Sequence, residues 1–363
     1  QGRSSGAQVS LVTKSGTNEL HGSLYEYHRN TVTTANRYFL NSTGIERPKL
    51  IRNIFGASAG FAPIKNRLFF FGNYEGRRDR RDQEAVRDVP SMNLRRGIVQ
   101  YPRRDGSIAT LLPSDIVSRI DGAGSINQAA LQALQKYPEP NDSTRGDNLN
   151  QVGYRFKAST PLRWNTYISR LDYVLDEANS HTLFVRGNLQ NDNESGLPQF
   201  PGQPPNSVTL RNNKGIAMGL TSVLRPTLIS NFRYGLTRVG QETTGIMNFG
   251  DVTFRELDQI VGRNKALAQI IPVHTIAEDM NWTRGAHSFQ FGATLRFISN
   301  RRINYNNSFS TASINASWLV DSGAVLNRPF TDVSPSAVTR FRYALSHVLG
   351  LVTQGNANYN YLV

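Results

Sequence analysis

The sequence predicts an all-β fold, an antiparallel transmembrane β-barrel meander, and two observations predict it. Several segments alternate apolar and polar residues with a period of two, which gives a strand one apolar and one polar face. Between Asn66 and Arg302, short connections also alternate with long ones. Membrane barrels combine both features, because tight turns join their strands on one rim and long loops join them on the other.

Four segments carry the alternation most clearly: Tyr167–Leu175, His181–Gln190, Leu228–Arg238 and Ser288–Phe297. In the last segment, every second residue from Phe289 to Phe297 is apolar. The charged side chains Arg170, Asp172, Arg186, Arg233 and Arg296 of these segments fall on the other face. This pattern is typical of strands that have lipid on one side and a polar interior on the other.

The connections show a consistent asymmetry between the two rims. The tight links are Ala62–Asn66, Asp176–Ser180, Arg225–Thr227 and Arg284–His287. The long links are Asn30–Lys49, Arg78–Arg163, Asn191–Asn213 and Gln241–Pro272. A soluble domain seldom carries so much irregular chain on one edge, whereas an outer-membrane barrel exposes such loops to the outside.

Composition agrees with a barrel. The mean hydropathy of −0.43 and the lack of a long apolar run in the sequence exclude a transmembrane helix, while barrel strands hide their hydrophobicity in alternation. The 363 residues include no cysteine, which excludes disulfides and cysteine-ligated metals. No signal peptide precedes Gln1, so we expect that any such segment was removed or lies outside this chain.

The formal net charge of +14 is dispersed along the chain. Its densest cluster is Arg77, Arg78, Arg80 and Arg81, with acidic residues interleaved, at the start of the longest predicted loop. A solvated strand end is the first interpretation, and a patch for anionic lipopolysaccharide or another anionic ligand is the second. Because aromatic residues are missing beside these arginines in the sequence, we expect no nucleic-acid binding.

No catalytic or metal-binding motif in the sequence has the surrounding residues that its function requires. The run Gly56–Gly60 matches the G-x-S-x-G pattern of a nucleophile elbow, which needs a strand before the serine and a helix after it. A turn and another strand follow instead. The six histidines lack metal-ligand spacing. We therefore expect no enzyme activity, no cofactor and no metal site.

Three stretches carry a family resemblance. GAQVSLVTKSGTN at Gly6–Asn18, followed by LHGSLYEY at Leu20–Tyr27, resembles the passage from plug to first barrel strand in TonB-dependent receptors of the Oar-like group. Asn53–Gly76 is similar to the second and third strands of that group, and Trp282–Gly292 matches a later stretch. Members of this group usually carry an N-terminal carboxypeptidase-regulatory-like domain.

The resemblance implies a domain organisation, partners and a location. Residues 1–18 would be the end of a plug domain, and residues 19–363 would be the N-terminal part of the barrel, with a long extracellular loop at 78–163. The protein would lie in the Gram-negative outer membrane, in contact with lipid and lipopolysaccharide. A TonB-type energy-coupling protein would act through a region outside this chain during uptake of a ligand that the sequence does not identify.

About ten strand candidates occur, the last at Asn356–Leu362. Since an open sheet leaves unpaired backbone groups in hydrocarbon, we expect the chain to be a fragment of a larger barrel with exposed apolar outer faces. Five charged residues on polar faces are predicted to line the interior: Arg170, Asp172, Arg186, Arg233 and Arg296. We expect them to bond to the plug or to water, and substrate contact by some of them is the alternative.

Two places break the alternation. Phe69, Phe70 and Phe71 occupy both faces of their strand, so an inward phenylalanine is expected to pack on the plug. Glu278 shares a face with Ile276 and Met280, and placing it toward lipid would cost roughly 1–3 kcal/mol depending on depth. A bulge or a position near the rim would remove that conflict.

Within the longest loop, Ile126–Tyr137 predicts a short helix with Asn127 as N-cap, which could cover the barrel mouth or form a ligand-capturing lid. The leading functional hypothesis is that the chain is a segment of an outer-membrane active transporter. The alternative is a soluble extracellular β-rich domain that binds glycans or surfaces, whose apolar face would need a second sheet to cover it. A passive porin ranks third, because the predicted plug strand at Ala7–Thr13 argues against it.

Overall fold

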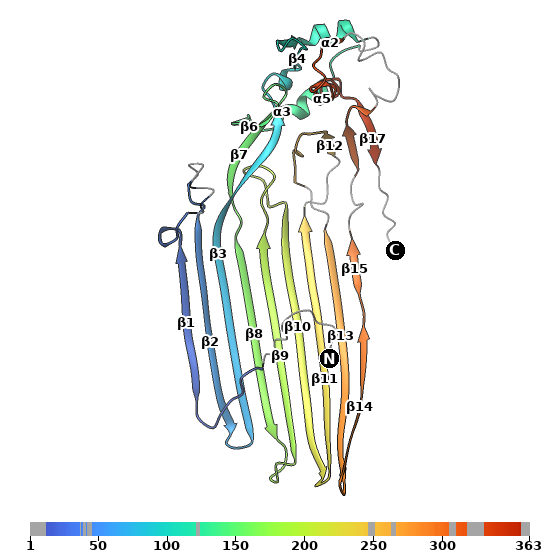
Figure 1. The fold of residues 1–363 in the computed structure, drawn as a ribbon. Coiled ribbons are helices and arrows are strands. Elements are labelled where there is room, and N and C mark those ends of the chain that lie inside the picture. Colours follow the sequence, from blue (N-terminus) through green and yellow to red (C-terminus); the bar gives the residue numbers. More distant parts are fainter. Residues whose placement is uncertain are drawn as a thin grey trace.

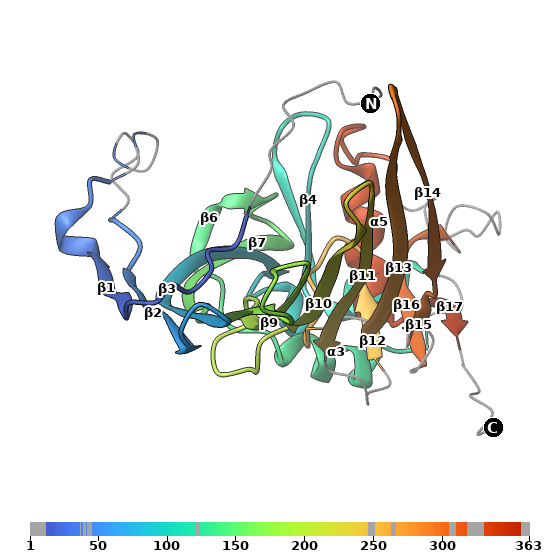
Figure 2. The ribbon, with the colours of Figure 1, turned by 90° about the horizontal axis from the view of Figure 1, so that it is seen from below.

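The computed structural model is dominated by one long antiparallel sheet that bends but does not close among the described residues (Figures 1 and 2). The structure describes residues 12–36, 38, 41, 46–120, 124–245, 251–262, 266–304, 310–317 and 330–356. The path of the sheet is β1 (His21–Asn30), β2 (Leu50–Ile64), β3 (Leu68–Pro90), β8 (Leu162–Val174), β9 (His181–Ser195), β10 (Ser207–Arg225), β11 (Leu228–Gly245), β13 (Leu267–Arg284) and β14 (His287–Ile298). Each strand pairs with its neighbour in this order, so the predicted meander is confirmed.

The register of the sheet sorts residues onto two faces. One row of directly paired residues is apolar across eight strands: Phe61, Phe70, Leu171, Val185, Met218, Tyr234, Ile276 and Leu295. On β14, Phe291, Leu295 and Phe297 are 54%, 56% and 58% exposed. We call this the outer face. Among the described residues no second sheet covers it, which is the arrangement expected for contact with lipid.

The predicted rim asymmetry is confirmed, but the strands are longer than the sequence suggested. All four tight links join consecutive strands at one end of the sheet. At the other end, β9 continues to Ser195 and β10 begins at Ser207, so most of the predicted long link Asn191–Asn213 is strand. Similarly, β3 continues to Pro90. The polar ends of these strands lack alternation, because they extend beyond the apolar band and no longer need a lipid-facing side.

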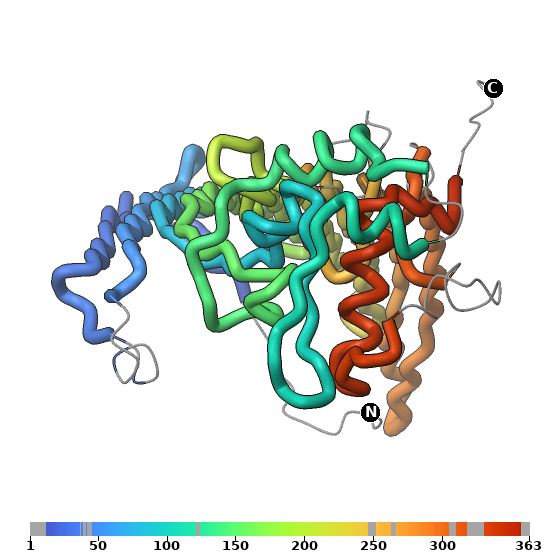
Figure 3. The backbone as a smooth tube through the Cα atoms, turned by 90° about the horizontal axis from the view of Figure 1, so that it is seen from above, coloured from blue at the N-terminus to red at the C-terminus, as the bar shows by residue number. Residues whose placement is uncertain are grey.

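The long connections build a compact cap over that end of the sheet (Figure 3). It contains η2 (Leu94–Arg96), β4 (Val99–Pro102), β5 (Ile108–Leu111), α2 (Pro113–Arg119), α3 (Gln128–Gln135), β6 (Asp142–Gly146) and β7 (Gln151–Ser159). It also contains β12 (Asp251–Phe254), β16 (Thr311–Ile314), α5 (Val338–Leu349) and β17 (Val352–Asn356). Two small pieces remain outside the cap, η1 (Thr31–Thr33) and β15 (Arg301–Asn304), which pairs with β13.

The cap has its own hydrophobic core, made from segments far apart in the sequence. Tyr101 packs on Phe341 with ring centroids 4.6 Å apart, and its hydroxyl donates to Asp332 at 3.0 Å. The predicted helix is confirmed as α3, where the Asn127 side chain accepts from the backbone N–H of Ala130 at 3.0 Å. Its Leu134 is fully buried. The long loops therefore form a packed unit rather than irregular chain.

Two expectations need correction. The last strand candidate, Asn356–Leu362, is wrong at its start, because Asn356 ends β17, which pairs with β16 in a three-stranded sheet of the cap; residues 357–363 lie outside the described residues. For Glu278, β13 has unbroken register on both sides, so no bulge removes it from the outer face. Instead Ser230 donates to the Glu278 carboxylate at 2.5 Å, which satisfies part of its hydrogen-bonding capacity.

The cap contains one buried basic group with a consequence for stability. His347 on α5 is 3% exposed, stacks edge-on against Phe254, and has no hydrogen-bond partner for either ring nitrogen among the described residues. Burial lowers the pKa of His347 from 6.5 to about 3. The charged groups around the adjoining small cavity are Asp147, Arg255, Glu256 and Arg340. The folded cap therefore holds this imidazole neutral.

Acidification is expected to loosen the cap through His347. Because its pKa is lower in the folded state, stability is complete above pH 6.5 and falls as the pH drops toward 3, by about 1.4 kcal/mol per pH unit in that window. The variant His347→Leu should lose this slope. Hydrogen exchange of α5 peptides in variant and wild type at matched pH measures it, with exposed His287→Leu as the control. Equal slopes in all three proteins would contradict the assignment.

Candidate functional site on the concave face

The face opposite the outer face is concave (Figure 2), and the register gathers the predicted interior residues there. Arg170 pairs directly with Arg186, and the same row continues through Ala217, Gly235 and Thr275 to Arg296. The next row on this face contains Asp172 and, three strands along the path, Arg233. All five residues thus occupy two adjacent rows, although whether they line a closed lumen stays a prediction.

Arg170 and Asp172 hold the described part of the N-terminal segment. Their side chains pair at 2.7 Å. Arg170 also donates to the backbone carbonyl of Thr13 at 3.0 Å, and the Ser15 hydroxyl donates to Asp172 at 2.5 Å. Residues 12–18 therefore dock on the concave face through both a backbone and a side-chain contact. The segment is the described part of the range that the sequence assigned to a plug.

Close backbone approach fixes the same segment. A Cβ on Gly16 would clash with the carbonyl oxygens of Phe61 and Phe70, so only glycine lets the chain lie this close to the β2–β3 hairpin. Beside this contact Phe71 points to the concave face, in register with Arg170, and is 8% exposed. The run Phe69–Phe71 therefore places phenylalanine side chains on both faces of the strand, since Phe70 lies in the apolar row of the outer face.

The other three predicted residues differ in their surroundings. Arg186 is half-buried, and its Nε has no hydrogen-bond partner among the described residues. Arg233 forms an ion pair with Asp279. Arg296 is exposed. Asp279 did not stand out in the sequence, but its position next to outer-facing Glu278 could have shown that it faces the concave side, since neighbours in a strand alternate.

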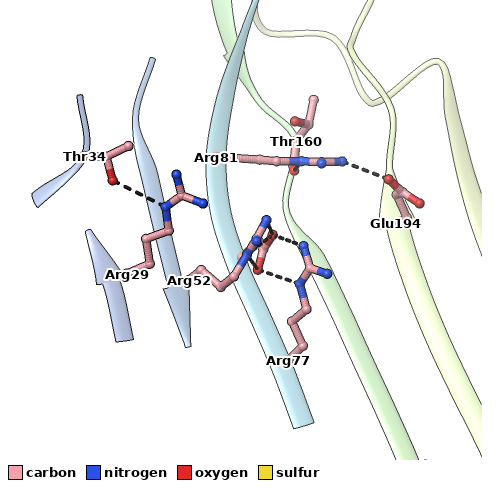
Figure 4. Close-up of polar contacts among 8 residues, drawn as sticks. Arg29, Thr34, Arg52, Arg77, Arg81, Thr160 and Glu194 are labelled. Atoms are coloured by element: carbon pink, nitrogen blue, oxygen red, sulfur yellow. Dashed lines mark hydrogen bonds and ion pairs between the residues drawn. The ribbon is translucent and has the colours of Figure 1, made fainter. Parts of the chain in front are cut away.

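A second polar cluster lies farther toward the cap, where β3 changes partner (Figure 4). The last β3–β8 pair is Asp79 with Leu162, and the first β3–β7 pair is Asp82 with Ser159. At this branch point Asp79 is 2% exposed and accepts from both Arg52 and Arg77, with closest distances of 2.9 and 2.8 Å. The branch is where the cap leaves the barrel wall.

Further arginine contacts tie neighbouring strands to the branch. Arg81 donates to the Thr160 carbonyl at 3.1 Å and to Glu194 on β9 at 2.8 Å. Arg211 on β10 lies 3.5 Å from the same Glu194 carboxylate. The guanidinium of Arg77 stacks on Trp164, 4.5 Å from the ring centroid. The network therefore connects β2, β3, β8, β9 and β10.

This geometry corrects the interpretation of the arginine-rich run. It is not a solvated strand end, because β3 continues beyond it and Arg77, Asp79 and Arg81 face the concave side in a paired network. The aromatic neighbours missing from the sequence run come from adjacent strands instead. Burial alone would raise the pKa of the Asp79 carboxyl, but hydrogen bonds and charge from Arg77 and Arg52 outweigh it and hold this pKa below its usual value.

Other site classes find little support in the described part of the chain. Within it no helix is both long and apolar enough to span a membrane. No group of three or more His, Asp or Glu side chains there could hold a metal ion. The Gly56–Gly60 run lies in the middle of β2, without the strand-to-helix turn that a nucleophile elbow requires.

Comparison with known proteins bears on this architecture. A family model for an outer membrane beta barrel domain matches residues 12–360. The chain belongs to this outer membrane beta barrel family. Its location is therefore the outer membrane, and the uncovered outer face of the sheet is the lipid-facing side of a barrel wall. A soluble β-rich domain is not favoured, since such a domain would cover that face.

Solved structures include a similar fold. The outer membrane transporter YddB from Escherichia coli has 13% sequence identity and a TM-score of 0.47, over 83% of this chain and 33% of that one. The chain thus spans about a third of the length of that transporter. No curated protein matches the chain.

Replacing Asp79 tests the branch-point network. In Asp79→Asn, two arginines lose their shared carboxylate in a buried site, and the free energy of unfolding should fall by about 2–4 kcal/mol, less than for fully buried ions because both arginines are partly exposed. Urea unfolding of the barrel in vesicles measures the loss. Asp105→Asn, at an exposed turn of the cap, is the matched control and should change stability little. An unchanged midpoint for Asp79→Asn would remove the network from any role in stability.

Proposed function

We propose that this chain is the barrel-wall segment of a TonB-dependent active transporter, and that residues 12–18 are the end of its plug. The observation that carries the proposal is the docking of Thr13 and Ser15 on Arg170 and Asp172 of the concave wall. A barrel that admits solutes only on demand needs a removable obstruction on this face. The resemblance to Oar-like receptors supports the same assignment.

The docking contacts suit a reversible attachment. They consist of the hydrogen bonds that the Thr13 carbonyl and the Ser15 hydroxyl make with a partly exposed ion pair, and of two hydrogen bonds between Asn18 and Asn66, rather than a large apolar interface. Hydrogen bonds to charged groups contribute on the order of 1.5–3 kcal/mol each. A pull applied by an energy-coupling protein on a region outside this chain would have to break these few polar contacts to free the segment from the wall. No covalent chemistry is involved.

Energy-dependent exposure of Ser15 tests the proposal without knowledge of the substrate. The chain has no cysteine, so Ser15→Cys introduces a single thiol into it. In cells that express the complete reading frame, an impermeant maleimide should label this thiol several-fold faster in energised cells than after a protonophore or after deletion of the coupling protein. The reason is that the Asp172 contact shields the site until the segment moves.

Two controls make the labelling decisive. Ser107→Cys, in the exposed turn between β4 and β5, should react at the same rate in all conditions. In Ser15→Cys with Asp172→Cys, a disulfide should abolish labelling until a reductant is added. If the labelling rate of Ser15→Cys is the same with and without energy and the coupling protein, active transport is rejected and a passive barrel is the remaining interpretation.

A further inference from the structure

Two pairs of cations stand directly opposite each other on the outer face. Arg78 of β3 pairs in register with Arg163 of β8, and Lys214 of β10 pairs with Arg238 of β11. Each lies an even number of residues from the apolar row, at Phe70, Leu171, Met218 and Tyr234 respectively, so all four belong to the outer face. Like charges directly opposite in a sheet are destabilising unless something neutralises them.

Nothing in the described part of the chain neutralises them, since none of the four forms an ion pair there. Within that part of the chain, their side-chain hydrogen bonds go to neutral groups. Arg78 donates to the carbonyls of Arg77 and Trp164 and to the Asn165 side chain, the last two at 2.7 Å. Arg238 donates to the carbonyl and side chain of Asn212. Arg163 and Lys214 are exposed. Each pair thus combines an anchored arginine with a free cation.

Both pairs lie at the same height above the short-turn rim. Arg78 follows the first residue of β3 by ten positions, as Arg238 follows the first residue of β11. Arg163 and Lys214 each precede the last residue of their strand by eleven. Ten or eleven residues span roughly 35 Å of strand, or about 27 Å vertically at the usual barrel tilt, which is close to the ~25 Å apolar band of such barrels.

Two tyrosines lie four positions below the cations on the same face. Tyr74 and Tyr234 each follow the first residue of their strand by six positions. Tyr74 lies 4.9 Å from Tyr167 between ring centroids and donates to Asn165, the same amide oxygen that accepts from Arg78. Both tyrosines therefore lie within the apolar band, and the Tyr74 hydroxyl reaches up to the amide that also holds Arg78. The rise of ten or eleven residues places the cation pairs at headgroup level on the long-loop rim, which in outer-membrane barrels faces outward.

We propose that each pair binds a phosphate of the outer-leaflet lipopolysaccharide. A phosphate between two opposed cations converts repulsion into charge-assisted hydrogen bonds, and arginine provides a matching fork of donors. An anion at the outer-leaflet headgroups is available without any conformational change of the wall. The proposal rests on the outer-membrane location and not on energy coupling, so it can fail independently of the transport proposal.

The test uses the protein from the complete reading frame, delipidated in a neutral detergent, with binding followed as the shift in its thermal unfolding. Phosphorylated lipopolysaccharide should stabilise the wild type. Arg78→Gln with Arg163→Gln should bind it at least tenfold more weakly, and so should Lys214→Gln with Arg238→Gln. Lys65→Gln with Arg225→Gln removes two exposed cations at the opposite rim and should bind like the wild type.

A reversal in the sign of the change in unfolding temperature distinguishes lost binding from a general loss of stability. Without lipid, Arg163→Gln alone should unfold at a higher temperature than the wild type, because it relieves repulsion and the Arg163 side chain forms no hydrogen bond or ion pair with the described residues. With lipopolysaccharide the order should invert. The proposal is overturned if the variants bind like the wild type, or if dephosphorylated lipopolysaccharide stabilises equally. Full saturation by inorganic phosphate or by an anionic phospholipid would overturn the lipopolysaccharide assignment.

Discussion

Unbroken cross-strand register is the constraint on which the rest of this structure depends. Backbone groups in hydrocarbon must find partners within the protein, so each wall strand pairs along nearly its whole length. Register then fixes every side chain, because a slip of one residue exchanges the two faces. The apolar row through Leu171 and Met218 and the charged row through Arg170 and Arg186 are one residue apart on the same strands. Their separation follows from pairing alone.

The fold follows from the sequence wherever that constraint acts. Alternation in segments such as His181–Gln190 shows the strands, and the tight links show one rim. The same reasoning fails beyond the apolar band. Residues near Asn191 and Arg78 remain paired in strands, but water reaches both faces there, so no periodicity records the pairing. Strand ends were therefore mistaken for loops.

The cap and the branch point were beyond sequence reasoning for a different reason. The cap core brings Tyr101 against Phe341, and no local pattern links residues so distant in the chain. Only α3 was foreseen, because its cap residue and its apolar side are local signals. The Asp79 network has the same character, since Arg52 and Glu194 come from other strands. The five predicted interior residues were within reach because each sits on an alternating strand.

The arginine-rich run of β3 shows how one stretch can serve two environments. Its odd-numbered members, Arg77, Asp79 and Arg81, face the concave side and hold the wall together where the cap departs. Its even-numbered arginines, Arg78 and Arg80, face outward above the tyrosines, and Arg78 lies opposite Arg163. Counted as a single patch, the run suggests one binding surface. When its residues are assigned to the two faces of the strand, the run contains one group that forms ion pairs on the concave side and another group of cations on the outer face. The net charge alone therefore does not indicate a partner.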